Sequence, residues 1–323
     1  MGSSTKSVCV PMPPLAGVAT KMAWVAFGRE SSILLKMENL SSRPLDIVCA
    51  CRAKDLPVLK LTAENLRQFV PFKSLRVFTA RSNFRECAAV LGPDVMMIDE
   101  DTALTGMTLE ELRRFPEPQF PQGAGWYFQQ FLKLSFAFTE TENDYYLIWD
   151  ADTIPLRPLQ FFDDQGRMLF TKSPEHHLPY FETYKNLFGK DPGYEFSFIS
   201  QHAIVRKSLL REMLQRVEKN LPGNESWPWK IMRNLGGNKP NRFSEYETWG
   251  HYVKNFHPEA AVYRDLPWSR EGNRLMPARP SAADLEKMGA QYAFIAFEAS
   301  HKGLRRFLKP LLNRFAIPGV GRR

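Results

Sequence analysis

The sequence predicts an α/β fold in which helices cover a mostly parallel central sheet. From residue 45 onward, segments typical of strands alternate with segments typical of helices, the order expected when each strand is followed by a crossover helix. The segment YYLIW (145–149) is apolar or aromatic throughout, as in a buried strand. With 323 residues, of which 44% are hydrophobic and 13% aromatic, the chain is long enough to bury a sizeable core.

The expected elements follow one another along the chain. The strands lie within 45–56, 74–80, 94–101, 145–149, 196–205 and 292–303, and the helices within 58–70, 82–92, 125–140, 206–220 and 243–256. The helix at 125–140 is rich in phenylalanine and leucine, so we expect it to be mostly buried and to lead directly into the 145–149 strand. The chain is expected to divide into an N-terminal extension (1–44), one α/β domain (45–302) and a C-terminal tail (303–323).

The C-terminal tail carries most of the excess positive charge. The formal net charge is +8, and seven lysines and arginines with no acidic residue lie between His301 and Arg323. Apolar residues from Leu304 to Phe315 recur at helical spacing with the basic residues off that stripe, which predicts a basic amphipathic helix, although Pro310 interrupts it. Such a helix can lie on an anionic membrane surface or pack against its own domain. Because these charges cluster in one tail, nucleic acid is not an expected partner.

The compartment is predicted from what the chain lacks. No segment approaches the ~18–20 unbroken apolar residues of a membrane helix. Three prolines (11, 13 and 14) interrupt the apolar N-terminal segment, which argues against a signal peptide. The four cysteines form neither a zinc pattern nor a disulfide framework, so they are expected to be reduced thiols. We expect a cytoplasmic protein, peripheral to the inner face of the membrane where the tail binds lipid.

Two carboxylates follow the buried strand directly, Asp150 and Asp152 in the segment WDADT. If the strand continues, both point to one face with Cα atoms about 6.6 Å apart at ~3.3 Å per residue. Two like charges at that spacing repel unless a cation lies between them, and Mn²⁺ or Mg²⁺ prefers such oxygen ligands. At the carboxyl edge of a parallel sheet the pair would clamp a metal ion and a diphosphate. The alternative is a structural turn, since Pro155 and Pro158 follow.

A second metal chemistry uses the same D-x-D pattern after a strand, that of aspartyl phosphatases of the haloacid-dehalogenase type. In those enzymes the first aspartate is a nucleophile, and threonine or valine stands two residues after the second. Here that position is Ile154, and the motif arrives after about a hundred residues of predicted α/β structure. The sequence therefore disfavours the phosphatase.

In combination, GWYFQQFLKL, YYLIWDADT, FSEYETWG and the late His301 resemble the GT-A fold of nucleotide-diphospho-sugar glycosyltransferases, and among them a bacterial-type glycosyltransferase-like group. The resemblance covers roughly residues 45–302 and implies a Rossmann-like GT-A domain there. It implies that Asp150, Asp152 and His301 hold Mn²⁺ or Mg²⁺. Gln130 and Lys133, which share one helix face, would contact the donor together with the aspartates.

The remaining site residues are also implied by the resemblance. Ala50, Arg52 and Asp101 would lie near the nucleotide. FSEYETWG corresponds to the place of the catalytic carboxylate in inverting members, so Glu245 and Glu247 are the candidates. Ser244 and Glu247 have capping-box spacing, which leaves Glu245 as the freer base; the usual Glu-Asp pair reads Glu245-Tyr246 here. Sugar rings of the acceptor are expected to stack on aromatic side chains, namely His177, Tyr180, Trp227 and Trp229.

The resemblance thus implies a metal-dependent, hexosyltransferase-type enzyme of polysaccharide biosynthesis. It would move a sugar from a nucleoside diphosphate, UDP favoured, to a hydroxyl of a glycan or lipid-linked acceptor, with inversion favoured. A retaining transferase of the same fold is the first alternative. The phosphatase and a non-catalytic nucleotide-sugar-binding protein are the others.

Overall fold

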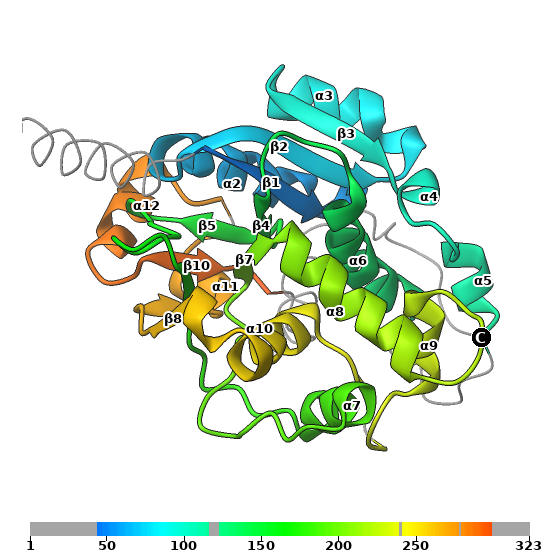
Figure 1. The fold of residues 1–323 in the computed structure, drawn as a ribbon. Helices are drawn as coiled ribbons and strands as arrows, with labels where there is room; N and C mark the ends of the chain where they lie inside the picture. The colour runs from blue at the N-terminus through cyan, green and yellow to red at the C-terminus, as the bar shows by residue number, and fades with distance from the viewer. Residues whose placement is uncertain (1–43, 116–122, 239–240, 278, 299–323) are drawn as a thin grey trace, which may run out of the picture.

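The computed structural model describes residues 44–115, 123–238, 241–277 and 279–298 (Figure 1). Its central sheet has five strands in the order β3-β2-β1-β4-β7. β1 pairs in parallel with β2 and β4, and β2 pairs in parallel with β3, whereas β7 runs antiparallel to β4 at the edge. The strand bounds are β1 Leu45–Ala50, β2 Phe72–Thr79, β3 Val95–Asp99, β4 Tyr145–Trp149 and β7 His202–Arg206. The predicted mostly parallel sheet is confirmed.

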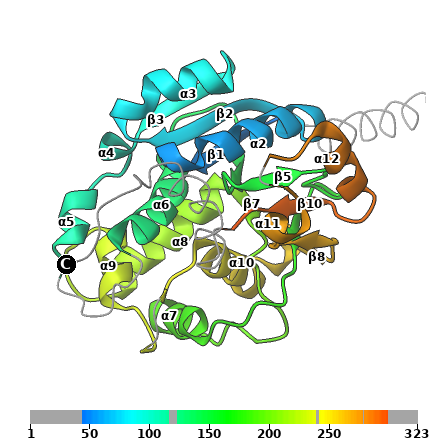
Figure 2. The ribbon, with the colours of Figure 1, turned by 180° about the vertical axis from the view of Figure 1, so that it is seen from behind.

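Helices cover both faces of this sheet. Figures 1 and 2 show α2 on one face and α6 and α8 on the other. This follows from the strand order, because β1, β2 and β3 advance in one direction while the chain then returns past β1 to place β4 on its other side. The helix bounds are α2 Leu56–Phe69, α3 Phe84–Leu91, α4 Glu100–Ala103, α5 Leu109–Arg113, α6 Ala124–Ser135, α7 Leu178–Phe188, α8 Lys207–Asn220, α9 Trp227–Arg233, α10 Glu245–Phe256, α11 Gly272–Leu275 and α12 Ala282–Gly289.

The core is centred on β4. Its four residues from Tyr146 to Trp149 are fully buried, as the apolar run predicts. The indole Nε1 of Trp149 donates to the Thr153 carbonyl oxygen at 2.6 Å, and the indole stacks on the His202 ring at 5.1 Å. β4 is therefore held rigidly at the point where it delivers the chain to Asp150.

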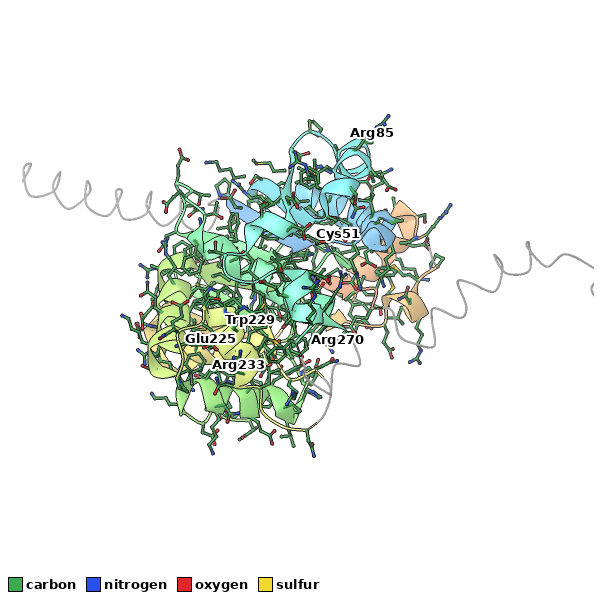
Figure 3. All side chains as sticks on the ribbon, turned by 90° about the vertical axis from the view of Figure 1, so that its right-hand side faces the viewer. Cys51, Arg85, Glu225, Trp229, Arg233 and Arg270 are labelled. Carbon is green, nitrogen blue, oxygen red and sulfur yellow. The ribbon has the colours of Figure 1, made fainter. Side chains whose placement is uncertain are left out.

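Two smaller sheets complete the fold. In one, β10 (Phe294–Ala296) lies between β5 (Thr153–Pro155) and β9 (Trp268–Ser269). In the other, β6 (Met168–Thr171) pairs in parallel with β8 (Ala261–Arg264). Figure 3 shows the side chains that fill the spaces between these layers, with Arg85 on α3 toward one end of the molecule and Arg233 on α9 toward the other.

Several predictions from the sequence lie outside the described residues. These are the extension up to residue 43, the basic tail (303–323) and its membrane contact, and His301. The cytoplasmic location stays a prediction as well. Within the described ranges, no helix has both the length and the apolar character needed to span a bilayer.

Candidate functional site

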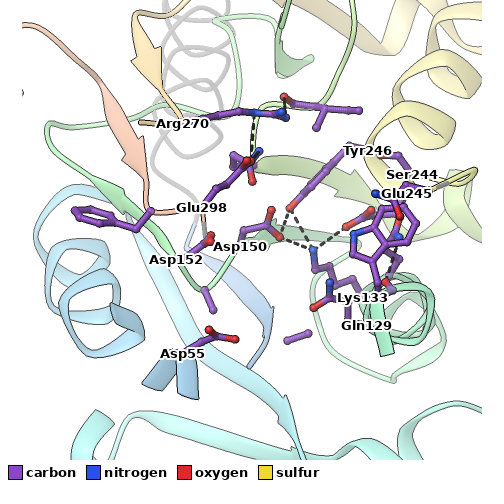
Figure 4. Close-up of a pocket in the computed structure, with 18 of the residues that line it drawn as sticks. Asp55, Gln129, Lys133, Asp150, Asp152, Ser244, Glu245, Tyr246, Arg270 and Glu298 are labelled. Atoms are coloured by element: carbon purple, nitrogen blue, oxygen red, sulfur yellow. Dashed lines mark hydrogen bonds and ion pairs between the residues drawn. The ribbon is translucent and has the colours of Figure 1, made fainter. Parts of the chain in front are cut away.

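A cavity of about 550 Å³ lies at the carboxyl ends of β1 and β4 (Figure 4). These neighbouring parallel strands mark the switch point of the sheet, because the chain leaves β1 toward β2 on one side and β4 occupies the other side. In open α/β sheets, ligands bind in the crevice formed at that point. The cavity is further lined by α6, by the N-terminus of α10 and by the segments around residues 175, 201, 270 and 298.

The D-x-D segment forms a turn. The Thr153 amide donates to the Asp150 carbonyl oxygen at 3.0 Å, and the chain then enters β5. The expectation that the β4 strand continues through Asp152 is therefore wrong, and the turn that was its alternative is present. Both aspartates nevertheless line the cavity, so their carboxylates can reach a ligand although the segment forms a turn.

A buried lysine links Asp150 to the start of α10. The Lys133 ammonium group lies 2.7 Å from Oε1 of Glu245 and also contacts Oδ1 of Asp150. The Tyr246 hydroxyl donates to the same Asp150 oxygen at 2.8 Å. One turn earlier on α6, Oε1 of Gln130 accepts a hydrogen bond from the Glu245 amide at 3.0 Å. Gln130 and Lys133 share a face of α6 and both line the cavity, as their spacing predicts.

The charges of this group depend on one another. Burial by itself lowers the pKa of Lys133, but the carboxylates of Asp150 and Glu245 outweigh burial, and its pKa lies above the usual value. Burial raises the pKa of Glu245, and the Lys133 ammonium opposes that rise. Lys133 is therefore the positive charge that allows the buried carboxylate of Glu245 to lie close to the partly buried carboxylate of Asp150.

The carboxylate of Asp152 lacks such a partner, accepting no hydrogen bond from the residues that the structure describes. Burial and then the neighbouring carboxylates of Asp150 and Glu298 raise the pKa of Asp152 to about 7. A cation at this place would relieve the repulsion, and Oδ2 of Asp150 remains open because Lys133 and Tyr246 both use Oδ1. The two aspartates thus fit a hard divalent ion.

Such an ion would have few protein ligands. Across the described ranges, no three histidine, cysteine, aspartate or glutamate side chains are grouped closely enough to hold a metal. Mg²⁺ is commonly bound through one or two carboxylates plus waters and substrate phosphates, so a pair of aspartates is sufficient for an ion that arrives with a diphosphate.

The loop after β1 forms the opposite side of the cavity. Ala50, Arg52, Lys54 and Asp55 line it, and Nε of Arg52 pairs with Asp55 at 3.3 Å. Asp101, by contrast, does not line the cavity; it is exposed in α4, and its amide donates to the capping carboxylate of Asp99 at 3.2 Å.

Glu247 is buried away from the cavity. Its Oε2 accepts from the Ser197 hydroxyl at 2.5 Å and from the Phe198 amide at 3.2 Å, and its Oε1 lies 2.8 Å from Nε2 of His251. Ser244 does cap the helix, accepting from the Glu247 amide at 3.3 Å. Glu247 therefore fastens the 197–198 segment to α10, and Glu245 is the glutamate of this pair that reaches the cavity.

Of the four aromatic residues predicted for the acceptor, Tyr180 lines the cavity. The His177 ring lies 4.5 Å from the Tyr180 ring, outside the cavity lining. Trp227 is buried against Phe131. The Trp229 indole, labelled in Figure 3, donates to the Gly106 carbonyl oxygen at 2.8 Å. The last two tryptophans therefore pack α9 against its neighbours.

Residues 46–263 match the model of a family described as "Family of unknown function (DUF6492)". The chain belongs to this family. No curated protein sequence matches the chain.

Among solved structures, this DUF6492 protein is similar to several glycosyltransferases. The galactosyltransferase LgtC, in complex with donor and acceptor sugar analogs, is 14% identical over 85% of this chain and 98% of that one, with a TM-score of 0.42. Mouse xyloside xylosyltransferase 1 is 12% identical over 79% and 98%, with a TM-score of 0.45. The glycosyltransferase GlyE of Streptococcus pneumoniae is 13% identical over 80% and 55%, with a TM-score of 0.36.

The DUF6492 cavity also contains residues that the sequence did not predict. Tyr246 bonds Asp150, and Arg270 pairs with the carboxylates of Glu175 and Glu298. Trp126 lies one turn before Gln130 on the same face of α6, so its helical spacing from Gln130 could have placed it in the cavity lining. Arg270, Glu175 and Glu298 come from separate loops and had no local signal.

Proposed function

We propose that this protein is a metal-dependent GT-A glycosyltransferase that moves a sugar from a nucleoside diphosphate to a hydroxyl acceptor. The observation that carries the proposal is the meeting of Asp150, Asp152, Lys133 and Glu245 in one cavity at the switch point of the sheet. The volume of about 550 Å³ is in the range of small-molecule sites.

The two sides of the cavity suit the two parts of such a donor. Arg52 and Lys54, in the loop after β1, offer positive charge to a nucleotide and its phosphates. Asp150 and Asp152 would hold Mn²⁺ or Mg²⁺, which as a Lewis acid would neutralise the charge that develops on the leaving diphosphate. A UDP-sugar remains the favoured donor, and a glycan or lipid-linked hydroxyl the favoured acceptor.

Glu245 is the proposed general base, which makes the reaction inverting. The acceptor oxygen would attack the anomeric carbon, the bond from that carbon to the diphosphate oxygen would break, and the acceptor proton would pass to Glu245. Lys133 and the Gln130 carbonyl group hold Glu245 through its side chain and its backbone amide, at 2.7 and 3.0 Å. Lys133 also favours the ionised carboxylate that a base requires.

The test is thermal stabilisation by UDP, GDP, CMP and dTDP, with and without Mn²⁺. We expect one nucleoside diphosphate to stabilise the wild type only with Mn²⁺, and Asp152→Asn to lose that response. Asp265→Asn is the matched control, since Asp265 is exposed and outside the cavity. Stabilisation by no nucleotide in either condition would remove the main support for a transferase. Release of phosphate from simple esters without an acceptor would instead favour the phosphatase.

A further inference from the structure

One side of the cavity is aromatic. Trp126 in the first turn of α6 and Tyr180 in the first turn of α7 both line it, with ring centroids 6.4 Å apart and planes inclined by 18°. We call these two rings the aromatic wall. Tyr127 packs edge-on against the Trp126 indole, with ring centroids 4.8 Å apart, and so supports the indole from one side. Trp126 is only half-buried, which leaves part of its surface open to the cavity.

A buried polar atom without a partner among the described residues lies in the same lining. The side-chain carbonyl oxygen of Asn241 is buried and accepts no hydrogen bond from the described part of the chain. Leaving a buried acceptor unpaired is costly, so this oxygen calls for a ligand that donates a hydrogen bond, such as a hydroxyl group.

The charge beside the aromatic wall disfavours a phosphate. After burial, the negative charges of Glu175 and Glu245 are the largest causes that raise the pKa of Tyr180. Arg270, which also lines the cavity, is already paired with Glu175 and with Glu298, the latter at 3.3 Å. A neutral ligand rich in hydrogen-bond donors therefore fits this side better than an anion does.

We propose that the acceptor is a saccharide, and that one of its sugar rings packs on the aromatic wall. The apolar C–H face of a pyranose would cover the Trp126 indole, and its hydroxyl groups would donate to Asn241 and Glu175. This inference rests on the proposed transferase and names its acceptor class. It also explains why the wall lies in the same cavity as Glu245, the base to which the reacting hydroxyl must be presented.

The experiment is saturation-transfer NMR on the full chain, with the methyl glycosides of glucose, galactose, mannose and N-acetylglucosamine as probes. Each is measured with and without UDP and Mn²⁺. We expect at least one glycoside to show saturation of its ring protons, and its affinity to fall about tenfold in Trp126→Ala. Trp126→Phe, which keeps an aromatic face, should lie between the two. Trp229→Phe is the matched tryptophan control, because Trp229 lies outside the cavity.

Thermal stabilisation by nucleotides, measured on the same variants, separates the two proposals. If nucleotide stabilises the protein and no glycoside binds, the saccharide inference is wrong and the transferase stands. If Trp126→Ala loses the nucleotide response as Asp152→Asn does, the aromatic wall holds the base of the nucleotide, which also overturns the inference. If a glycoside binds through Trp126 while no nucleotide stabilises the protein, the saccharide subsite is supported and the proposed transferase fails. If neither binds, both are overturned.

Discussion

Replacing Lys133 by methionine should destabilise the protein strongly, and more at pH 8 than at pH 5. The side chain is 5% exposed and lies between the carboxylates of Asp150 and Glu245. Removing one partner of a buried ion pair leaves uncompensated charge, at a cost of about 3–5 kcal/mol. Methionine has a similar length, so the loss of packing is small by comparison.

The pH dependence follows from Glu245. Burial already raises its pKa in the folded protein, and without Lys133 to oppose burial the pKa rises further. A carboxyl group with a folded-state pKa above that of the unfolded chain destabilises the fold progressively as pH rises between the two values. The deficit of the variant should therefore shrink at pH 5 by about 1.4 kcal/mol for each pH unit over which Glu245 is protonated only in the folded state.

The measurement is urea unfolding of wild type and Lys133→Met at both pH values. Lys230→Met is the matched control, because Lys230 is equally buried but bonds backbone carbonyl groups, including that of Leu221 at 2.7 Å. Its deficit should be the same at pH 5 and pH 8. Adding Glu245→Gln to Lys133→Met should recover part of the loss. Equal deficits at both pH values for Lys133→Met, with no recovery in the double variant, would refute the reasoning.

Three further changes test other parts of the structure. Burial and then Arg264 lower the pKa of His202 to about 3, so this histidine ionises between pH 6.5 and pH 5 only in the unfolded chain. The free energy of unfolding of the wild type should therefore fall by roughly 2 kcal/mol over that range. Urea unfolding of His202→Gln should lack this fall, and an unchanged acid sensitivity of the variant would contradict the prediction. Gly250→Ala should cost about 1–3 kcal/mol by thermal or urea unfolding, because its Cβ would overlap the buried ring of Phe198, and an unaltered stability would show that α10 can shift. Glu247→Gln should lower stability by about 1–3 kcal/mol yet keep the nucleotide-induced thermal shift, whereas loss of that shift would place Glu247 in the site.

The regular elements could be predicted because their patterns are local. The apolar run at 145–149 and the helical periodicities at 58–70 and 206–220 correspond closely to β4, α2 and α8. The apolar run at 196–205 predicted a strand that is too long, since strand β7 begins only at His202. Gln201 lies just before β7 and has a φ of 65°, a left-handed conformation that a glutamine in the sequence does not indicate. The turn at Asp150 was one of two alternatives that the sequence left open, and the pairing of β5 with β10 fixes the course of the chain after it.

The candidate site was predictable where its residues lie close in sequence to the strand or to one helix face. Asp150, Asp152, Gln130 and Lys133 are of this kind, and all of them line the cavity. Glu245 was preferred to Glu247 as the base because Glu247 has the spacing of a capping box with Ser244. In the structure the Glu247 side chain does not bond the helix start, as a capping box requires, but bonds the 197–198 segment. Arg270 depends on how distant loops meet, which no local pattern encodes.

The unequal environments of the two aspartates explain how one short turn can serve both structure and ligand. Asp150 gives Oδ1 to Lys133 and Tyr246, so its carboxylate is fixed in orientation by groups from α6 and α10. Asp152 is left with neighbouring negative charge and no protein partner among the described residues. An arrangement built for stability alone would have neutralised both carboxylates. A fixed carboxylate beside an unpaired one instead suits a site that binds a cation only together with the diphosphate of a ligand.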